Sequence, residues 1–356
     1  MHRKYKIITK VSCCLGIYFL VVYPLKLFYD SSQRCQKIIS FFGFNLMPLS
    51  EEEEKYPLAY GMLVYKWTDQ VYYTVSAFYQ PQNQYCIGID NKSDRAFKRN
   101  VGYLAQCFPN IHVMEVPAVS YCGHSVIWAV HLCLRYLTSL PSKWKYYQYL
   151  TGFDLPLKTN HQMVRIFKQL NGSFNGEVKA FQLDRLRNKS NMHPPYKLKL
   201  FKSSLSATFS RETAEFLASS REAMALLSFL NGTFCPDESF WTTLIGNKNG
   251  SYYCKPENLT AVPFYISQCW LSGKYVSASC AFGVGDVPSL LQRPQLVAHK
   301  FYLDYEPAAY FCLYQKVRER AQEDIASFNE KPYGDLPGPR LTRGEDISEW
   351  FKNNAY

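Results

Sequence analysis

The sequence predicts an α/β fold built on a doubly wound, largely parallel sheet, in one or two packed units behind an N-terminal membrane anchor. Its 356 residues are 47% hydrophobic, 16% aromatic and 19% charged, a composition that can bury a large core and differs from that of disordered chains. Strand-like and helix-like stretches alternate from residue 58 onward, as they do in doubly wound sheets. One long apolar run follows a basic N-terminus.

The apolar run at 11–29 predicts a transmembrane signal anchor. About twenty residues suffice to cross a bilayer, and the run reaches this length if Lys26 extends to the interface. The basic residues within 1–10 should stay in the cytoplasm, which leaves the rest of the chain in the lumen. A cleaved signal peptide is the alternative, but no small-x-small cleavage site follows the run, so we favour an uncleaved anchor.

Cysteines and glycosylation motifs point to an oxidising, secretory compartment. The chain has 12 cysteines but no pair of CxxC motifs of the zinc-binding kind, so disulfides are expected. Its formal net charge of +11 comes from basic residues spread along the chain, so nucleic acid is not an expected partner. Six Asn-x-Ser/Thr motifs suit a luminal protein. They begin at Asn91, Asn171, Asn188, Asn231, Asn249 and Asn258.

The chain beyond the anchor begins with a stem and continues into the sheet. Residues 30–57 predict a short stem, in which the four glutamates at 51–54 should form only a solvated surface. Apolar stretches then predict four buried strands separated by three helices. The strands are expected at 58–66, 84–90, 110–117 and 145–150, and the helices at 69–79, 94–107 and 123–139.

The second half of the sequence is less regular. A helix is expected at 161–172, and the polar, basic segment at 171–198 predicts a long loop, where binding groups often lie. Residues 209–232 predict one helix with Ser210 as its N-cap. The expected divisions are a tail at 1–10, the anchor at 11–29, the stem at 30–57, the domain at 58–325 and a C-terminal tail at 326–356.

Asp90 ends the second predicted strand and is a candidate contact for a nucleotide. Ligands of doubly wound sheets bind beyond the carboxyl ends of the strands. An aspartate that only caps the following turn is an equally good interpretation. There is no GxGxxG and no GxxxxGK[ST], so a Rossmann dehydrogenase or a Walker-type NTPase is disfavoured.

The stretch "FCPDESFWTT" raises a second question, because Asp237 and Glu238 are adjacent carboxylates. Pro236 suits the first position of a helix, and acidic side chains in the first turn favour the positive end of the helix dipole. That explanation is sufficient for both residues. The alternative is that one carboxylate, at the rim of a pocket, takes a proton from an attacking hydroxyl as a general base.

Five blocks of sequence stand in the order and spacing of one enzyme family: "PLSEEEEKYPLAYGMLVYK", "FYQPQNQYCIGIDNKS", "WKYYQYLTGFDLPLKTN", "FCPDESFWTTL" and "CAFGVGD". The chain resembles glycosyltransferase family 14, in particular the core 2-type β-1,6-N-acetylglucosaminyltransferases, from about residue 48 to 315. The resemblance implies a GT-A-like fold, a Golgi membrane location and O-glycan acceptors. It also implies inverting transfer of N-acetylglucosamine from UDP-GlcNAc to the C6 hydroxyl of a galactose or N-acetylgalactosamine.

The resemblance also implies roles for individual residues. Glu238 stands at the family's catalytic base, while Leu63, Asp90, Tyr121 and Lys300 stand at positions that meet the UDP-sugar. No cofactor or metal is expected, since the family works without one and the sequence lacks Asp-x-Asp. Cationic side chains must then stabilise the departing diphosphate.

One family cation is missing. Ser277 stands at the position of an arginine that meets the diphosphate, and Lys274 is the candidate substitute. This departure keeps two alternatives open, namely transfer of another sugar such as glucose or xylose, and an inactive glycan-binding member of the family.

Acceptor contacts and disulfides follow from the same resemblance. Basic acceptor contacts are expected in the 171–198 segment, and an aromatic side chain could stack on a sugar. The candidates are Arg185, Arg187, Lys189 and Trp270. The implied disulfides are Cys35–Cys107, Cys86–Cys133 and Cys269–Cys280, and Cys312 also aligns, but the counterpart of its usual partner in the stem is not evident. Cys122, Cys235 and Cys254 are unassigned, and a bridge among them is left open.

Overall fold

The computed structural model describes residues 33–176, 178–247, 265–266, 271–276, 279–322 and 328–346. The predicted anchor lies outside these residues. Within them, no helix combines the length and the apolar character that crossing a bilayer requires.

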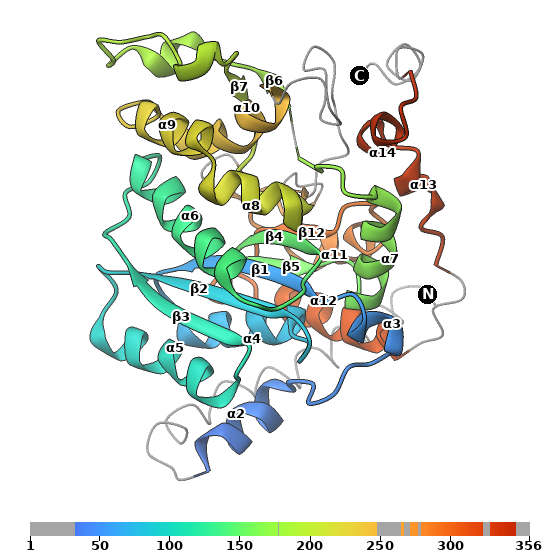
Figure 1. Ribbon diagram of the computed structural model, residues 1–356. Coiled ribbons are helices and arrows are strands. Elements are labelled where there is room, and N and C mark those ends of the chain that lie inside the picture. Colours follow the sequence, from blue (N-terminus) through green and yellow to red (C-terminus); the bar gives the residue numbers. More distant parts are fainter. Residues whose placement is uncertain are drawn as a thin grey trace.

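A five-stranded sheet forms the centre of the molecule (Figure 1). Its order is β3-β2-β1-β4-β8, with the first four strands parallel and β8 antiparallel to β4. These strands are β1 (Leu58–Val64), β2 (Gln84–Asp90), β3 (Ile111–Val116), β4 (Tyr146–Thr151) and β8 (Thr208–Ser210). The four parallel strands are the four that the sequence predicts, so the α/β class with a largely parallel sheet is confirmed.

The direction of strand addition reverses between β1 and β4. After β1 the chain adds β2 and β3 on one side, and it then crosses back to place β4 on the other side. Such a switch point leaves a crevice at the carboxyl ends of the two strands, because the flanking helices lie on opposite faces.

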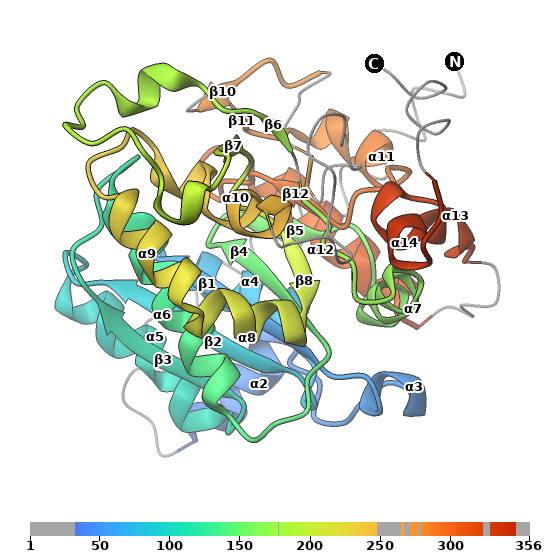
Figure 2. The same ribbon diagram turned by 45° about the horizontal axis from the view of Figure 1, so that its top comes forward.

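Helices cover both faces of the sheet (Figures 1 and 2). The helices are α2 (Arg34–Phe42), α3 (Glu51–Glu54), α4 (Thr68–Phe78), α5 (Arg95–Cys107), α6 (His124–Ser139), α7 (Asn160–Leu170), α8 (Arg211–Ser219), α9 (Arg221–Phe229), α10 (Phe240–Asn247), α11 (Val287–Leu290), α12 (Pro307–Arg320), α13 (Lys331–Gly334) and α14 (Pro337–Thr342). The 3₁₀ turns are η2 (Leu183–Leu186), η3 (Pro195–Lys197), η4 (Pro236–Glu238) and η5 (Val284–Asp286).

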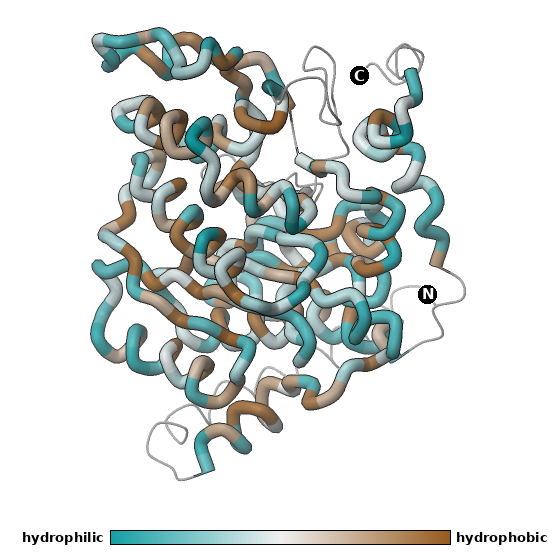
Figure 3. The backbone as a smooth tube through the Cα atoms, in the orientation of Figure 1, coloured by the Kyte–Doolittle hydropathy of each residue, from teal (hydrophilic) through white to brown (hydrophobic). Residues whose placement is uncertain are grey.

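The strand side chains alternate between two hydrophobic cores. Tyr60 and Met62 of β1 belong to the core that includes α4, α5 and α12, whereas Ala59 belongs to the core under α6, α8 and α10. This alternation is the two-residue period of a strand buried on both faces. Figure 3, which colours the backbone by hydropathy, shows hydrophobic residues in the central strands and in the helices that flank them.

A second, three-stranded sheet extends the carboxyl end of the first. Its order is β5-β12-β9, with β12 antiparallel to β5 and parallel to β9. The remaining strands are β5 (Asp154–Pro156), β9 (Tyr265–Ile266), β12 (Val297–His299), β6 (Lys179–Ala180) paired with β7 (Phe201–Lys202), and β10 (Tyr275–Val276) paired with β11 (Ser279–Cys280). Because β12 pairs with β5, and β5 comes directly after β4, the chain after residue 299 returns to the end of β4.

Helix starts agree with the capping residues in the sequence. Asp94 accepts a hydrogen bond from the Phe97 amide at 2.8 Å and begins α5. Thr159 and Gln162 form a capping box at the start of α7, each side chain accepting from the other's backbone N–H. The helices expected at 69–79, 94–107 and 123–139 are α4, α5 and α6 within one or two residues at each end.

The single helix predicted at 209–232 is wrong, because the structure has two. Ser210 does cap α8, accepting from the Thr213 amide at 3.3 Å. At Ser220, however, the backbone is extended, with φ −65° and ψ 152°, and its hydroxyl accepts from the Ala223 amide at 3.1 Å. A second N-cap therefore ends α8 and starts α9 within a pattern that is helical on both sides.

The stem and the C-terminal segment pack against the domain. Phe42 of α2 is buried, with its ring 4.9 Å from that of Tyr72. The solvated role predicted for the four glutamates is wrong for Glu53, which is 1% exposed and accepts from Asn160 Nδ2 at 2.7 Å. Leu336, between α13 and α14, joins the core around α7.

Two disulfides join secondary-structure elements of the molecule, one between two helices and one between a strand and a helix. Cys35–Cys107 joins α2 to the end of α5, and Cys86–Cys133 joins β2 to α6. Both pairings are those that the resemblance implies. The Cys269 half of the expected Cys269–Cys280 pair lies outside the described residues, as does Cys254, whereas Cys280 and Cys312 are both disulfide-bonded.

Candidate active site

A cavity of about 560 Å³ lies at the carboxyl ends of β1, β2 and β4. This is the crevice that the strand order leaves open. Its lining includes Leu63, Asp90, Tyr121 and Lys300, the four residues that the resemblance assigns to the UDP-sugar, and also Glu238. The fold therefore brings residues from Leu63 to Lys300 into one site.

Asp90 closes β2 and holds the loop that follows β3. Its Oδ1 accepts from the Lys92 amide at 2.9 Å and from the Val119 amide at 3.2 Å. The Lys92 ammonium lies 3.8 Å from Oδ2 and donates to the Val119 carbonyl. Asp90 therefore caps the next turn, as one interpretation of the sequence held, while it also lines the cavity.

Lys300 enters the cavity from the second sheet, directly after β12. It is 8% exposed, and burial lowers the pKa of its ammonium, whereas the carboxylate of Asp154 acts to raise it. Its neighbour His299 also lines the cavity, and its Nδ1 is 2.7 Å from Asp154 Oδ1. Asp154 in turn accepts from the Thr151 hydroxyl at 2.9 Å, so three segments are joined at the cavity wall.

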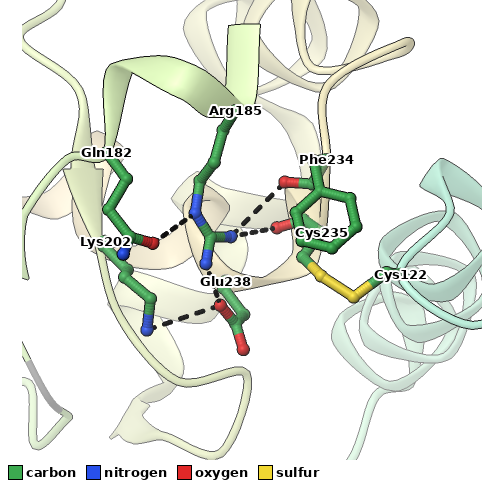
Figure 4. Close-up of a disulfide and its surroundings, with 7 residues drawn as sticks. All are labelled: Cys122, Gln182, Arg185, Lys202, Phe234, Cys235 and Glu238. Atoms are coloured by element: carbon green, nitrogen blue, oxygen red, sulfur yellow. Dashed lines mark hydrogen bonds and ion pairs between the residues drawn. A yellow bond between two sulfur atoms is a disulfide. The ribbon is translucent and has the colours of Figure 1, made fainter. Parts of the chain in front are cut away.

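Glu238 is the last residue of η4 and projects its carboxylate toward two cations (Figure 4). Arg185 Nη2 donates to Oε2 at 2.6 Å, and Lys202 Nζ lies 3.4 Å from the same oxygen. Its side chain is 34% exposed, and no group of the described residues hydrogen-bonds to Oε1. One oxygen of a residue that lines the cavity is therefore held by cations, while the other has no hydrogen bond within the described part of the chain.

Asp237 has more than the helix-capping role that the sequence suggests. It lines the cavity beside Glu238, and no group in the described part of the chain hydrogen-bonds to its Oδ1. Burial, and then the charge of Glu238, raise the pKa of Asp237 to about 6. The two adjacent carboxylates are thus held in different environments.

Arg185 is not placed as an open acceptor contact. It is 7% exposed, and besides Glu238 it donates to Gln182 Oε1 at 2.8 Å and to the carbonyls of Phe234 and Cys235 at 3.3 and 3.2 Å. Its guanidinium is thus buried and engaged by four acceptors within the protein, one of them Glu238, while acceptor binding by Arg185 stays a prediction.

The other basic candidates lie apart from the cavity lining. Arg187 is exposed, with its guanidinium 6.0 Å from the Phe234 ring. Lys189 donates to the Asn231 carbonyl at 2.8 Å, near the end of α9. Lys274 places its ammonium 3.6 Å over the Tyr305 ring, outside the described lining of the cavity. Trp270 and Ser277 lie outside the described residues.

Several residues of the site carry no signal in the sequence. Lys202 lies in the two-residue strand β7, and the hydrogen bond from the Ser203 amide to the Glu238 carbonyl at 2.6 Å holds the end of this strand beside Glu238. Tyr149 and Thr151 line the cavity at the carboxyl end of β4, within and directly after the strand predicted at 145–150, so the rule for ligand sites of doubly wound sheets could have found them. The contact of His299 with Asp154 depends on a pairing between strands more than 140 residues apart.

Three comparisons with known proteins bear on this site. The profile of the Core-2/I-branching enzyme family matches residues 58–290. The N-acetyllactosaminide beta-1,6-N-acetylglucosaminyl-transferase of Mus musculus is 31% identical over 335 residues, covering 85% of this chain and 83% of that protein. The beta-1,3-galactosyl-O-glycosyl-glycoprotein beta-1,6-N-acetylglucosaminyltransferase of Bos taurus is 29% identical over 326 residues, covering 82% of this chain and 76% of that protein.

Proposed function

Since the chain belongs to the Core-2/I-branching enzyme family, we propose that it transfers N-acetylglucosamine from UDP-GlcNAc to the C6 hydroxyl of a galactose or N-acetylgalactosamine in an O-glycan. The chain is a glycosyltransferase, and its similar relatives are named as β-1,6-N-acetylglucosaminyltransferases. The observation that carries the proposal is the single cavity in which Asp90, Tyr121, Lys300 and Glu238 meet.

Glu238 is the proposed catalytic base. Its Oε1 accepts the proton of the C6 hydroxyl, and the hydroxyl oxygen then attacks the anomeric carbon from the face opposite UDP. The bond between that carbon and the diphosphate oxygen breaks, its electron pair leaves with UDP, and the configuration inverts. Arg185 and Lys202 hold Oε2 at 2.6 and 3.4 Å, which keeps the carboxylate in one orientation.

Lys300 is the proposed cation for the departing diphosphate. It lies in the cavity at the end of β12, where its charge can offset the charge that develops on the leaving oxygen. Asp90, Leu63 and Tyr121 line the same cavity and are proposed to contact the rest of the UDP-sugar. Lys274 is kept as a weaker candidate, because it lies over Tyr305.

We propose that this chemistry needs no metal. Asp304 and Glu306 are the nearest approach to an Asp-x-Asp motif, and the Glu306 carboxylate accepts from the Val284 amide at 3.0 Å. Neither residue is among the described residues that line the cavity. Transfer is therefore expected to persist in EDTA.

We further propose that the protein is a single-pass type II Golgi membrane protein with a GT-A-like luminal domain. The support is the apolar run at 11–29 with its basic flank, together with the disulfides of the domain. The divisions at 1–10, 11–29, 30–57, 58–325 and 326–356 belong to this proposal. Protease protection and glycosidase sensitivity of the chain in intact microsomes would test its orientation.

The decisive test uses the purified luminal part with UDP-GlcNAc, UDP-glucose and UDP-xylose, each with a Gal-GalNAc acceptor in EDTA. We expect transfer from UDP-GlcNAc, with a new β-1,6 linkage identified by NMR of the product. Preference for UDP-glucose or UDP-xylose would replace the donor in the proposal. Glycan binding without turnover of any donor would instead identify an inactive member of the family.

A further inference from the structure

We infer that the Cys122–Cys235 disulfide is a positioning element of the active site, which fixes the loop beside the donor relative to Glu238. This inference rests on the proposed transfer reaction and adds to it two residues that no resemblance assigns. The bridge is present between two cysteines whose segments are separated by 113 residues of sequence.

The bridge joins two segments that both contribute to the cavity lining, and Figure 4 shows it beside Arg185 and Glu238. Cys122 follows Tyr121 in the loop between β3 and α6, and it lines the cavity. Cys235 directly precedes η4, which carries Glu238. The Cys235 amide also donates to the Cys122 carbonyl at 3.0 Å, so the two segments are joined through both backbone and sulfur.

On the acceptor side, Cys235 is linked to Glu238 and to Arg185, one of the two cations that contact the base. Its carbonyl accepts from Arg185 Nη1 at 3.2 Å and from the Glu238 amide at 3.1 Å. Arg185 Nη2 in turn donates to Glu238 Oε2 at 2.6 Å. A shift of Cys235 therefore moves both η4 and the guanidinium of Arg185, and the carboxylate of Glu238 moves with them.

On the donor side, the same loop is held to the end of β2. The Val119 amide donates to Asp90 Oδ1 at 3.2 Å, and the Gly123 amide donates to the Ser120 carbonyl at 2.9 Å. The connection thus runs from Asp90 through this loop and across the sulfur atoms to η4. It joins the groups proposed to bind the sugar donor to the group proposed to activate the acceptor.

The reaction is sensitive to such a connection. The attacking oxygen and the anomeric carbon must come within about 3 to 3.5 Å in line, and a misplacement of about 1 Å can cost on the order of 10²-fold in rate. Both half-cystines also adopt left-handed backbone conformations, with φ of 54° at Cys122 and 45° at Cys235. Cysteine adopts this region rarely, so each turn depends on contacts that hold it.

The other two described bridges supply a matched control. None of Cys35, Cys107, Cys86 and Cys133 is among the described residues that line the cavity. The Cys35–Cys107 bridge spans 72 residues against 113 for Cys122–Cys235, so chain entropy predicts losses of stability of similar size when either is removed. Only removal of Cys122–Cys235 should change the rate of transfer.

The test compares C122A/C235A with C35A/C107A in thermal unfolding, UDP binding and steady-state transfer. We expect both variants to lose stability. Only C122A/C235A should lose kcat, by about 10- to 100-fold, with its affinity for UDP largely kept because Asp90 ends β2 and Lys300 directly follows β12, both outside the two bridged segments. Equal kcat in the two variants would overturn the inference. A wild-type protein without transfer would overturn the proposed function instead.

A second measurement avoids any variant that fails to fold. The wild-type protein is titrated with a dithiol at a temperature where it stays folded, and each free thiol is alkylated and located by mass spectrometry. Transfer is expected to fall in step with the appearance of Cys122 and Cys235 thiols. Full activity with this pair reduced would overturn the inference, whatever the state of the other bridges.

Discussion

Arg185→Lys should separate an arginine that orients the base from one that binds the acceptor. The substitution keeps the positive charge but removes the planar fork that serves four acceptors at once. A lysine ammonium at this place can still meet Glu238, but it cannot also reach Gln182 and the carbonyls of Phe234 and Cys235.

The expected magnitude follows from the three lost hydrogen bonds. Each goes to a neutral acceptor and contributes about 0.5 to 1.5 kcal/mol, so the free energy of unfolding should fall by about 2 to 4 kcal/mol. For a domain of this size that corresponds to a drop in Tm of roughly 5 to 15 °C. The looser carboxylate should lower kcat by about 10- to 100-fold, with the donor KM unchanged.

Thermal unfolding and transfer kinetics of Arg185→Lys and Arg187→Lys would check this reasoning. Arg187 is two residues away and exposed, so its substitution should change stability by less than about 0.5 kcal/mol. If Arg185→Lys keeps its Tm and kcat while the acceptor KM rises, the arginine binds the acceptor and the positioning role is refuted.

Three further substitutions test the site. Glu238→Gln should lower kcat by about 10² to 10⁴-fold while UDP still binds, and a wild-type rate would remove Glu238 as the base. Lys300→Ala should lower kcat by about 100-fold or more, whereas Lys274→Ala should have little effect, and the reverse pattern would assign the diphosphate cation to Lys274. Asp237→Asn should raise the Tm at pH 7. Because the folded-state pKa of Asp237 is raised to about 6, the wild type loses stability as pH rises from about 4 to 6, by at most about 3 kcal/mol before solvent screening. The difference in Tm between Asp237→Asn and wild type should therefore vanish near pH 4, and a difference that is constant across this range would contradict the assignment.

The strands and most helices of the domain could be predicted because their signals are local. The apolar composition of runs such as 58–64 and 84–90 predicts buried strands. Asp94 and Thr159 mark the starts of helices, because their side chains cap backbone amides within three residues. The break at Ser220 was missed because the apolar pattern continues across it, while the extended serine is fixed by its own side chain. Local patterns therefore predict that a helix or strand is present more reliably than they predict where it ends.

The residues of the site can likewise be divided into those that sequence blocks identify and those whose contacts depend on tertiary packing. Glu238, Asp90 and Lys300 could be named from sequence blocks that resemble a family, and the cavity brings them together. The contact of Arg185 with Glu238 could not be foreseen, because it depends on the distance between η2 and η4, which tertiary packing sets. Burial of Glu53 was missed for the same reason, since its partner Asn160 is 107 residues away.

The spread of the cavity along the chain has a consequence for biosynthesis. Its described lining begins at Leu63 and ends at Tyr302, so nearly the whole domain must be synthesised before the site can close. A nascent chain that already contains Asp90 and Glu238 still lacks β12, and with it the strand that pairs with β5 and delivers Lys300. Such long-range pairing forms slowly and leaves strand edges exposed in the meantime. Chains truncated before this point should therefore depend on chaperones and have no transferase activity, even though they carry Glu238, the proposed base.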